Sequence, residues 1–332
     1  MKSCCLSALH WSQRLFLILA VTLSLLGQKA YGQAQNAGAL FLLLPVGAHA
    51  VGQSEAVVAD SSLGGEGIWW NPSGLARMRK RELAIHHSQT FGATSEMLTF
   101  VYPSRALGTF ATAANVVDYG GEGVATDSTG AVIGNITNRN YLFVVSYASP
   151  IGKGLSVGIS GKVILYRVGC PGCVINIYSN TNAIDLGAQY RLPSSVPITL
   201  GASVRNIGQA LQTKDAEQAD PLPRVIQVGG RVRVPIAALD SNDTSLDILT
   251  DVFVSPAYSG PSIRFGAVLT YSKDYTLRIG YKTAAGAEDK QNGFSIGLGL
   301  TKGSVGLDFA RRFDATSQFG KAPTYVSLRA LF

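Results

Sequence analysis

The eight residues 275–282, YTLRIGYK, decide the fold of this chain. Large apolar residues alternate with polar or small ones along this stretch, as in a β-strand whose two faces meet different surroundings. One face carries Tyr275, Leu277, Ile279 and Tyr281, and the other carries Thr276, Arg278, Gly280 and Lys282. The same alternation returns in residues 294–301, 305–310 and 326–332. The sequence therefore predicts an all-β fold.

The alternation reaches back to Leu83 and predicts a barrel of 14 antiparallel strands. The predicted strands are 83–90, 95–103, 107–117, 139–149, 154–167, 182–192, 197–206, 225–234, 244–254, 262–272, 275–283, 292–300, 304–313 and 324–332. After a short first hairpin, short turns alternate with longer loops such as 118–138, 168–181 and 207–223. Short periplasmic turns and long outer loops are typical of outer-membrane barrels.

The N-terminus predicts a secretory signal peptide over residues 1–32. Two basic residues precede the apolar run 15–26, which is too short to span a bilayer, and Ala30-Tyr31-Gly32 favours cleavage before Gln33. Cleavage one residue later and an uncleaved anchor are the alternatives. Cleavage removes three basic residues and lowers the formal net charge from +7 to +4.

No apolar run after Gly32 is long enough for a transmembrane helix, so any membrane span must be a closed sheet. Alternation alone does not distinguish a membrane barrel from a soluble sandwich. The signal peptide, the aromatic residues near strand ends and the terminal Phe332 favour the barrel. We predict that residues 83–332 form a transmembrane antiparallel β-barrel in the outer membrane of a Gram-negative-type bacterium, in contact with outer-membrane lipid.

Residues 33–82 lack the strand pattern. They contain a glycine-rich stretch, 64–67, followed by the adjacent pair Trp69-Trp70. Two neighbouring tryptophans exposed to water are unfavourable. The segment is therefore predicted to fold into the barrel lumen as a plug, or hatch, instead of hanging in the periplasm.

Three stretches of this segment resemble motifs of the PorV/PorQ family of outer-membrane proteins, whose barrel is similar to FadL-type transporters. They are residues 44–52 (LPVGAHAVG), 55–60 (EAVVAD) and 70–76 (WNPSGLA). The layout of the whole mature chain fits the family, but these motifs lie only in residues 44–76. His49 departs from the family pattern, which has Arg at this position.

The resemblance implies a hatch or gate built around Trp70, Asn71, Pro72 and Gly74. It also implies two kinds of role. FadL-like relatives pass hydrophobic molecules through the barrel, whereas other relatives act as cargo shuttles in the type IX secretion system.

The predicted strand register turns many charged side chains toward the lumen. The basic ones are Lys162, Arg191, Arg205, Arg231, Arg233, Arg264, Arg278, Lys282, Arg312 and Arg329, and the acidic ones are Asp185, Asp247, Asp251 and Asp308. One interpretation is a structural network that ties the hatch to the wall. The other is a basic substrate path that favours anions or the carboxylates of lipid-like solutes.

Two cysteines remain after the predicted cleavage, in Cys170-Pro171-Gly172-Cys173. An exported protein meets an oxidising compartment, so a local Cys170–Cys173 disulfide is expected. A thioredoxin-type motif would need a helix that the strand-like flanks do not offer, and zinc would need more ligands.

The sequence offers no support for an enzyme, a cofactor, a metal site or nucleic-acid binding. His86 and His87 point to opposite faces of a strand, so they do not share a metal. We predict a FadL-like channel that passes hydrophobic or amphipathic, anionic small molecules across the outer membrane. The alternative is a non-transporting component of a type IX-like secretion assembly, a cargo shuttle or platform.

Overall fold

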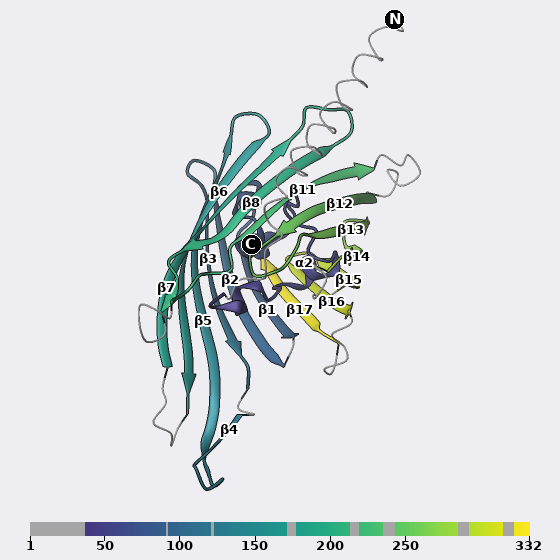
Figure 1. The fold of residues 1–332 in the computed structure, drawn as a ribbon. Coiled ribbons are helices and arrows are strands. Elements are labelled where there is room, and N and C mark those ends of the chain that lie inside the picture. The colour runs from purple at the N-terminus through teal and green to yellow at the C-terminus, as the bar shows by residue number, and fades with distance from the viewer. Residues whose placement is uncertain are drawn as a thin grey trace, which may run out of the picture.

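The structure, a computed structural model, describes residues 37–90, 92–120, 123–170, 177–212, 219–234, 243–284, 292–314 and 322–332. Fourteen antiparallel strands form a closed barrel, as the sequence predicts (Figure 1). They are β1 (Glu82–Thr90), β2 (Ala93–Ser104), β3 (Gly108–Asp118), β5 (Val132–Ile151), β6 (Leu155–Gly169), β7 (Ile177–Arg191), β8 (Ile198–Gly208), β11 (Val225–Val234), β12 (Ser245–Val254), β13 (Ser262–Tyr271), β14 (Tyr275–Lys282), β15 (Gly293–Lys302), β16 (Val305–Asp314) and β17 (Thr324–Leu331).

Neighbours in the barrel are mostly neighbours in the chain, and the pairing of β1 with β17 closes it. Three further strands lie in the long loops. β4 (Gly123–Thr126) pairs with the outer part of β5, and β9 (Leu211–Gln212) pairs with β10 (Ala219–Asp220). We call the end of the barrel with the long loops the loop end, and the opposite end the short-turn end.

Strands β5 and β7 begin earlier than the sequence predicts. β5 starts at Val132 instead of 139, and β7 starts at Ile177 instead of 182. Along residues 132–139 of β5 both faces are largely exposed, because this part reaches beyond the belt of apolar outward side chains. A strand that meets water on both faces shows no apolar alternation, so the pattern alone does not reveal it.

The outward face carries a belt of exposed apolar side chains, among them Phe265, Ile279 and Leu298. Leu298 is 57% exposed, which is unfavourable in water but suits contact with lipid. The inward face is polar or small, as in residues 275–282, where Arg278 and Lys282 are buried. The described ranges contain no helix that is long and apolar enough to cross a membrane.

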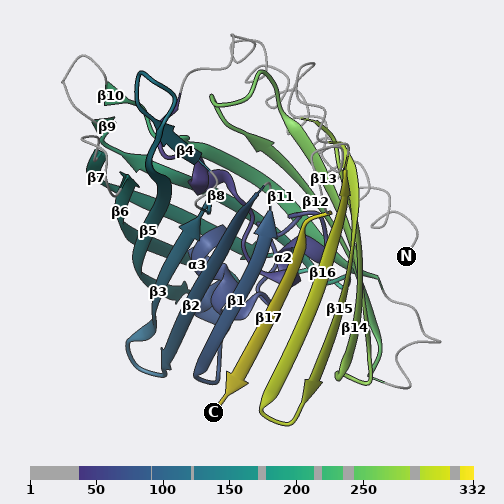
Figure 2. The same cartoon turned by 90° about the horizontal axis from the view of Figure 1, so that it is seen from below.

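Residues 37–81, which we call the hatch, lie inside the barrel (Figure 2). Their short helical elements are η1 (Leu40–Leu43), α2 (Ala48–Gly52), η2 (Gly64–Glu66), α3 (Gly67–Trp70) and η3 (Pro72–Arg77). α2 contacts β14–β17, whereas η3 contacts the opposite wall at β5–β7. The hatch therefore spans the lumen from one wall to the other.

Candidate functional site

The Trp-Asn-Pro-Ser motif folds as a capped helical turn at the centre of the hatch. The carboxamide oxygen of Asn71 accepts hydrogen bonds from the backbone N–H and the hydroxyl of Ser73, and Pro72 occupies the first helical position. Both features start a helix, since the cap satisfies a free N–H and proline has none to satisfy. The Asn71 Nδ2 donates to the carbonyl of Val58 at 2.6 Å, which joins two parts of the hatch. Trp70 donates its indole N–H to the carbonyl of Val46.

Inward-facing glycines of the wall let the hatch backbone lie directly on the strands. They are Gly158 on β6, Gly201 on β8, Gly266 on β13 and Gly280 on β14, while Gly187 on β7 makes room for the side chain of Asn71. A Cβ at Gly280 would lie 2.5 Å from the backbone nitrogen of Ser54, and one at Gly158 would lie 2.5 Å from that of Ser73. Real side chains do not approach this closely, so these positions need glycine. The glycine-rich composition of the barrel thus has a specific role at its inner face.

Glu55 holds the hatch to β13, β14 and β16. Its carboxylate lies 3.1 Å from the guanidinium of Arg264, 3.3 Å from that of Arg312 and 3.5 Å from Lys282 Nζ. Burial raises the pKa of Glu55, but the three cations outweigh burial and lower it to about 2. Ser54 and Glu55 both have left-handed backbones, with φ of 51° and 64°. Such conformations are unfavourable for side chains other than glycine, so the surrounding contacts must hold them in place.

A second set of contacts ties the hatch to β11 and β14. Asp60 accepts from Arg231 at 2.9 Å, from Gln53 at 2.9 Å and lies 3.2 Å from the imidazole of His49. The other imidazole nitrogen of His49 lies 3.2 Å from the guanidinium of Arg278. Burial raises the pKa of Asp60, but Arg231 and His49 lower it well below its ordinary value. Burial and Arg278 lower the pKa of His49, which favours the neutral imidazole.

Two further carboxylates complete the attachment of the hatch. Glu66 accepts from the backbone N–H groups of His49 and Ala50, so it fixes the start of α2. Burial, followed by the nearby Asp308, raises the pKa of Glu66 to about 8. Asp251 on β12 accepts from two successive hatch N–H groups, those of Val57 at 2.6 Å and Val58 at 2.8 Å.

The structure places nearly all of the predicted lumen residues inside the barrel, and it gives most of them partners. Buried are Lys162, Arg205, Arg264, Arg278, Lys282 and Arg312, together with Asp185, Asp247, Asp251 and Asp308. Arg231 and Arg329 are partly buried, and Arg233 is half exposed at the short-turn end. Arg191 differs, because it is exposed at the last position of β7, where the barrel interior ends.

The hatch supplies acidic residues that the count of wall charges leaves out. Glu55, Asp60 and Glu66 are all buried and face basic or N–H donors of the wall or of the hatch itself. Glu55 and Asp60, whose pKa values are lowered, thus compensate part of the apparent surplus of positive charge on the wall, whereas the raised pKa of Glu66 favours its neutral form. The contacts favour the interpretation of these arginines as a network that ties hatch to wall.

Cations of the wall also cover the two hatch tryptophans. Lys162 Nζ lies 5.5 Å from the ring centre of Trp69, and the Arg205 guanidinium lies 5.0 Å from that of Trp70. Lys162 in turn pairs with Asp185 at 2.6 Å, and Arg205 donates to the carbonyl of Trp69. Cation–π contacts of this kind add to the attachment of the hatch at its centre.

One side of the inner wall carries no charge. The inward side chains of β2, of β3 and of residues 140–148 of β5 are uncharged and buried: Ala93, Ser95, Met97, Thr99, Val101, Thr109, Ala111, Ala113, Asn115, Val117, Asn140, Leu142, Val144, Ser146 and Ala148. Many of them belong to one apolar cluster with the hatch residues Phe41, Leu42, Trp69, Trp70 and Leu75. We call this face the uncharged wall. The lumen is therefore divided lengthwise into an uncharged side and an ionic side.

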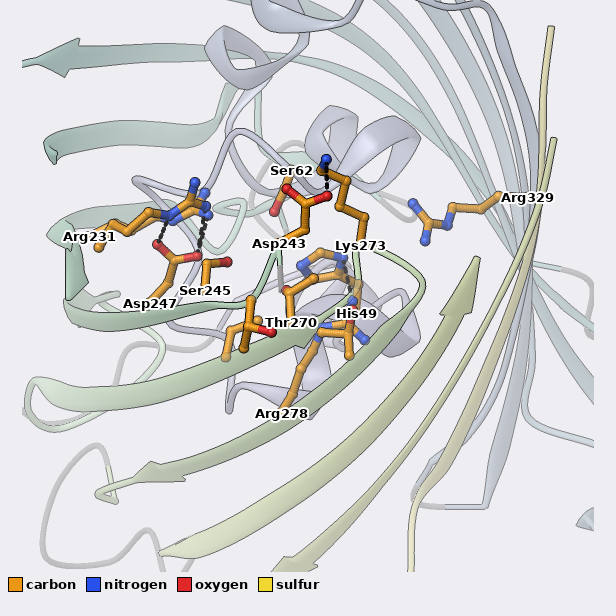
Figure 3. A pocket seen from close by; sticks show the side chains of 14 residues that line it. His49, Ser62, Arg231, Asp243, Ser245, Asp247, Thr270, Lys273, Arg278 and Arg329 are labelled. Carbon is orange, nitrogen blue, oxygen red and sulfur yellow. Dashed lines mark hydrogen bonds and ion pairs between the residues drawn. The ribbon is translucent and has the colours of Figure 1, made fainter. Parts of the chain in front are cut away.

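A cavity of about 470 Å³ lies at the short-turn end, on the ionic side (Figure 3). Its lining comes from the hatch, from β11–β14 and from β17: His49, Ser62, Arg231, Arg233, Asp243, Thr244, Ser245, Asp247, Val268, Thr270, Lys273, Thr276, Arg278 and Arg329. Arg231 and Arg233 both bind Asp247, and Lys273 binds Asp243. Most residues that line the cavity are polar or charged, so it does not by itself suit a hydrocarbon.

Solved structures share this architecture. The toluene transporter TbuX of Ralstonia pickettii matches with a TM-score of 0.52 at 14% identity, over 86% of this chain and 98% of that chain. The monoaromatic hydrocarbon channel CymD matches with a TM-score of 0.56 at 12% identity, over 87% and 98%. The toluene transporter TodX of Pseudomonas putida gives 0.52 at 13% identity, over 82% and 94%.

This chain has the fold of these channels. At 12–14% identity, the likeness is one of fold. The sequence matches no protein-family model and no curated sequence. Membership of the PorV/PorQ family therefore stays a prediction, and so does the signal peptide, which lies outside the described residues.

The two cysteines and the histidine pair are the remaining residues that the sequence singled out. Cys170 is buried and disulfide-bonded, but Cys173 lies outside the described residues, so the pairing of the two stays a prediction. His86 is buried toward the lumen, where its Nδ1 lies 2.9 Å from the Ser327 hydroxyl. His87 faces outward beside Glu96, which confirms that the two histidines lie on opposite faces.

Proposed function

We propose that this barrel passes small apolar or amphipathic molecules across the outer membrane. The observation that carries the proposal is the uncharged wall of β2, β3 and β5, which runs along the barrel beside an otherwise ionic lumen. Interiors of outer-membrane barrels are commonly polar, so a continuous face without charge needs a reason. A path for solutes that bind poorly to charged groups supplies that reason.

The gate of this path is the turn η3 with its Asn71 cap. η3 packs on β5, β6 and β7, so it covers the edge of the uncharged wall. Pro72 and Ser73 lie directly on Gly158, and Arg77 donates to the carbonyl of Gly154. Among the described residues, η3 makes no ion pair with the wall, in contrast to the region around Glu55. A shift of η3 opens the uncharged side while the ionic side stays attached.

The basic residues of the lumen have a different role in this proposal. Their carboxylate partners compensate their charges, so they position the hatch and do not guide anions. The exposed cations of the polar cavity, Arg233 and Lys273, offer a place for the polar end of an amphipathic molecule near the exit. The structural neighbours are named as carriers of toluene and monoaromatic hydrocarbons, which supports small hydrocarbons as the first substrates to test.

Uptake by intact cells tests the proposal, because lipid vesicles without an outer membrane already admit hydrocarbons. The full gene is expressed in a Gram-negative host that lacks its own hydrophobic-compound channel, and entry of radiolabelled toluene and of a labelled fatty acid is measured. Val144→Asp places a charge on the uncharged wall and should reduce uptake several-fold. Val268→Asp, an equally inward position on the ionic side, should leave it nearly unchanged.

Heat-modifiable gel migration establishes that both variants fold before uptake is compared. Uptake that equals that of the empty vector, or equal loss in both variants, contradicts the proposal. If uptake is absent and deletion of the gene in its own host blocks export of other surface proteins, a secretion role replaces the channel.

A further inference from the structure

Basic residues mark the turns all around the short-turn end. They include Arg81 before β1, Arg105 between β2 and β3, Lys153 between β5 and β6, Arg191 at the end of β7, Lys273 between β13 and β14, and Lys302 between β15 and β16. All six side chains are exposed. We call this set the basic rim.

Most of the rim is not neutralised by acidic neighbours. Lys273 pairs with Asp243, but no carboxylate in the described part of the chain forms an ion pair with the other five rim residues. At the loop end, by contrast, the outward Arg139 pairs with Asp118 at 2.7 Å. Unpaired exposed cations are hydrated and well placed to bind anions from outside the protein.

The rim lies next to a girdle of exposed aromatic side chains. Tyr102, Tyr147, Tyr190, Tyr271 and Tyr275 face outward close to the same end of their strands, each at least 39% exposed. Arg81 stacks on the ring of Tyr102, with 4.6 Å between the guanidinium and the ring centre. Aromatic girdles mark the boundary between hydrocarbon and headgroups. Side chains one turn beyond the girdle therefore lie at the level of lipid phosphates.

We propose that the basic rim binds the phosphate groups of anionic phospholipids, such as phosphatidylglycerol, in the leaflet at the short-turn end. Short turns face the periplasm in outer-membrane barrels, so this is the phospholipid leaflet. The cations lie at every connection of this end except that between β11 and β12, as suits lipids that surround the barrel, whereas a docking protein would select one sector. Each Lys or Arg near a membrane surface favours an anionic lipid about fivefold.

The test compares lipids around the mature protein in vesicles. Spin-labelled phosphatidylglycerol and phosphatidylcholine with equal chains are used, and electron spin resonance measures the share of each that contacts the barrel. The wild type should prefer phosphatidylglycerol by up to about fivefold, and salt should weaken the preference. The triple variant Arg105→Gln, Lys153→Gln, Lys302→Gln should bring the preference close to one.

A matched variant removes three outward arginines near the loop end: Arg139→Gln, Arg167→Gln, Arg311→Gln. It should keep most of the preference. Equal association of both lipids with the wild type overturns the proposal, and so does equal loss in the two triple variants. If the rim variant keeps its lipid preference but loses a periplasmic protein that copurifies with the wild type, an acidic protein is the partner and the lipid proposal fails.

Discussion

Replacement of Glu55 by glutamine should loosen the hatch without opening the barrel. The carboxylate faces three cations of the wall, and their combined effect lowers its pKa from 4.5 to about 2. At about 1.4 kcal/mol per pH unit, this lowering corresponds to roughly 3 kcal/mol. Glu55→Gln removes that charge and leaves the buried Arg264, Lys282 and Arg312 without their shared anion, which costs about 3–5 kcal/mol in comparable buried pairs.

Tryptophan fluorescence separates release of the hatch from unfolding of the barrel. Trp69 and Trp70 both lie in the hatch at 2% exposure, and Trp11 leaves with the predicted signal peptide. Denaturant titration of the mature protein in detergent micelles then reports the hatch, while heat-modifiable gel migration reports the barrel. Glu55→Gln should lower the ratio of seated to released hatch by at least about 100-fold, since each 1.4 kcal/mol is a factor of ten.

The pH dependence has a definite sign. Because the folded pKa of Glu55 is depressed, its contribution is present above about pH 4.5 and is lost as pH falls toward 2. The wild-type hatch should weaken across this window, and Glu55→Gln should weaken less, since Asp60, whose pKa is also lowered, still contributes an acid-sensitive contact. Asp118→Asn is the control, since it breaks a wall-to-wall ion pair with Arg139 and leaves the hatch contacts intact. A Glu55→Gln protein that releases its hatch at the same denaturant concentration as Asp118→Asn would refute the reasoning.

Three further outcomes are expected. Gly280→Ala places a Cβ 2.5 Å from a hatch backbone nitrogen and should weaken the attachment of the hatch by about 1–3 kcal/mol. At Gly161 an added Cβ points into open space, so Gly161→Ala should be neutral. Equal effects of the two variants in the fluorescence titration would count against the close contact. Glu66 has a raised folded pKa of about 8, so its contribution is present below about pH 4.5 and is lost as pH rises from 4.5 to about 8, and Glu66→Gln should remove this loss from the same titration. Intact-mass measurement without reduction should find Cys170 and Cys173 joined, and serine at both positions should leave uptake nearly unchanged.

The strand pattern was sufficient to predict the wall. Residues 275–282 alternate so strictly that their register follows from the sequence, and the structure places Arg278 and Lys282 inside as expected. Alternation works here because lipid and lumen impose opposite preferences on neighbouring residues. It fails where both faces meet water, as in the outer part of β5.

The partners of the hatch could not be predicted in this way. Glu55 and Asp60 belong to a segment without periodicity, and nothing local indicates that they face Arg264 and Arg231 across the lumen. One signal was available. A buried lumen cannot hold many uncompensated charges, so the surplus of basic residues on the wall already required acidic residues in the hatch.

If the barrel is a channel as proposed, the lengthwise division of the lumen explains how one hatch can be firmly attached and still admit a solute. Full release breaks the contacts of Glu55, Asp60 and Asp251, and the first of these alone is worth roughly 3 kcal/mol. A shift of η3 breaks no ion pair among the described residues. It disturbs the packing of η3 on β5–β7, the hydrogen bond from Arg77 to the carbonyl of Gly154 and the contacts of Asn71 with the carbonyls of Ala188 and Ala202. The proposed gate therefore opens along the uncharged wall while the ion pairs of the ionic side stay intact. In this proposal the lumen arginines hold the rest of the hatch in place and do not guide anions.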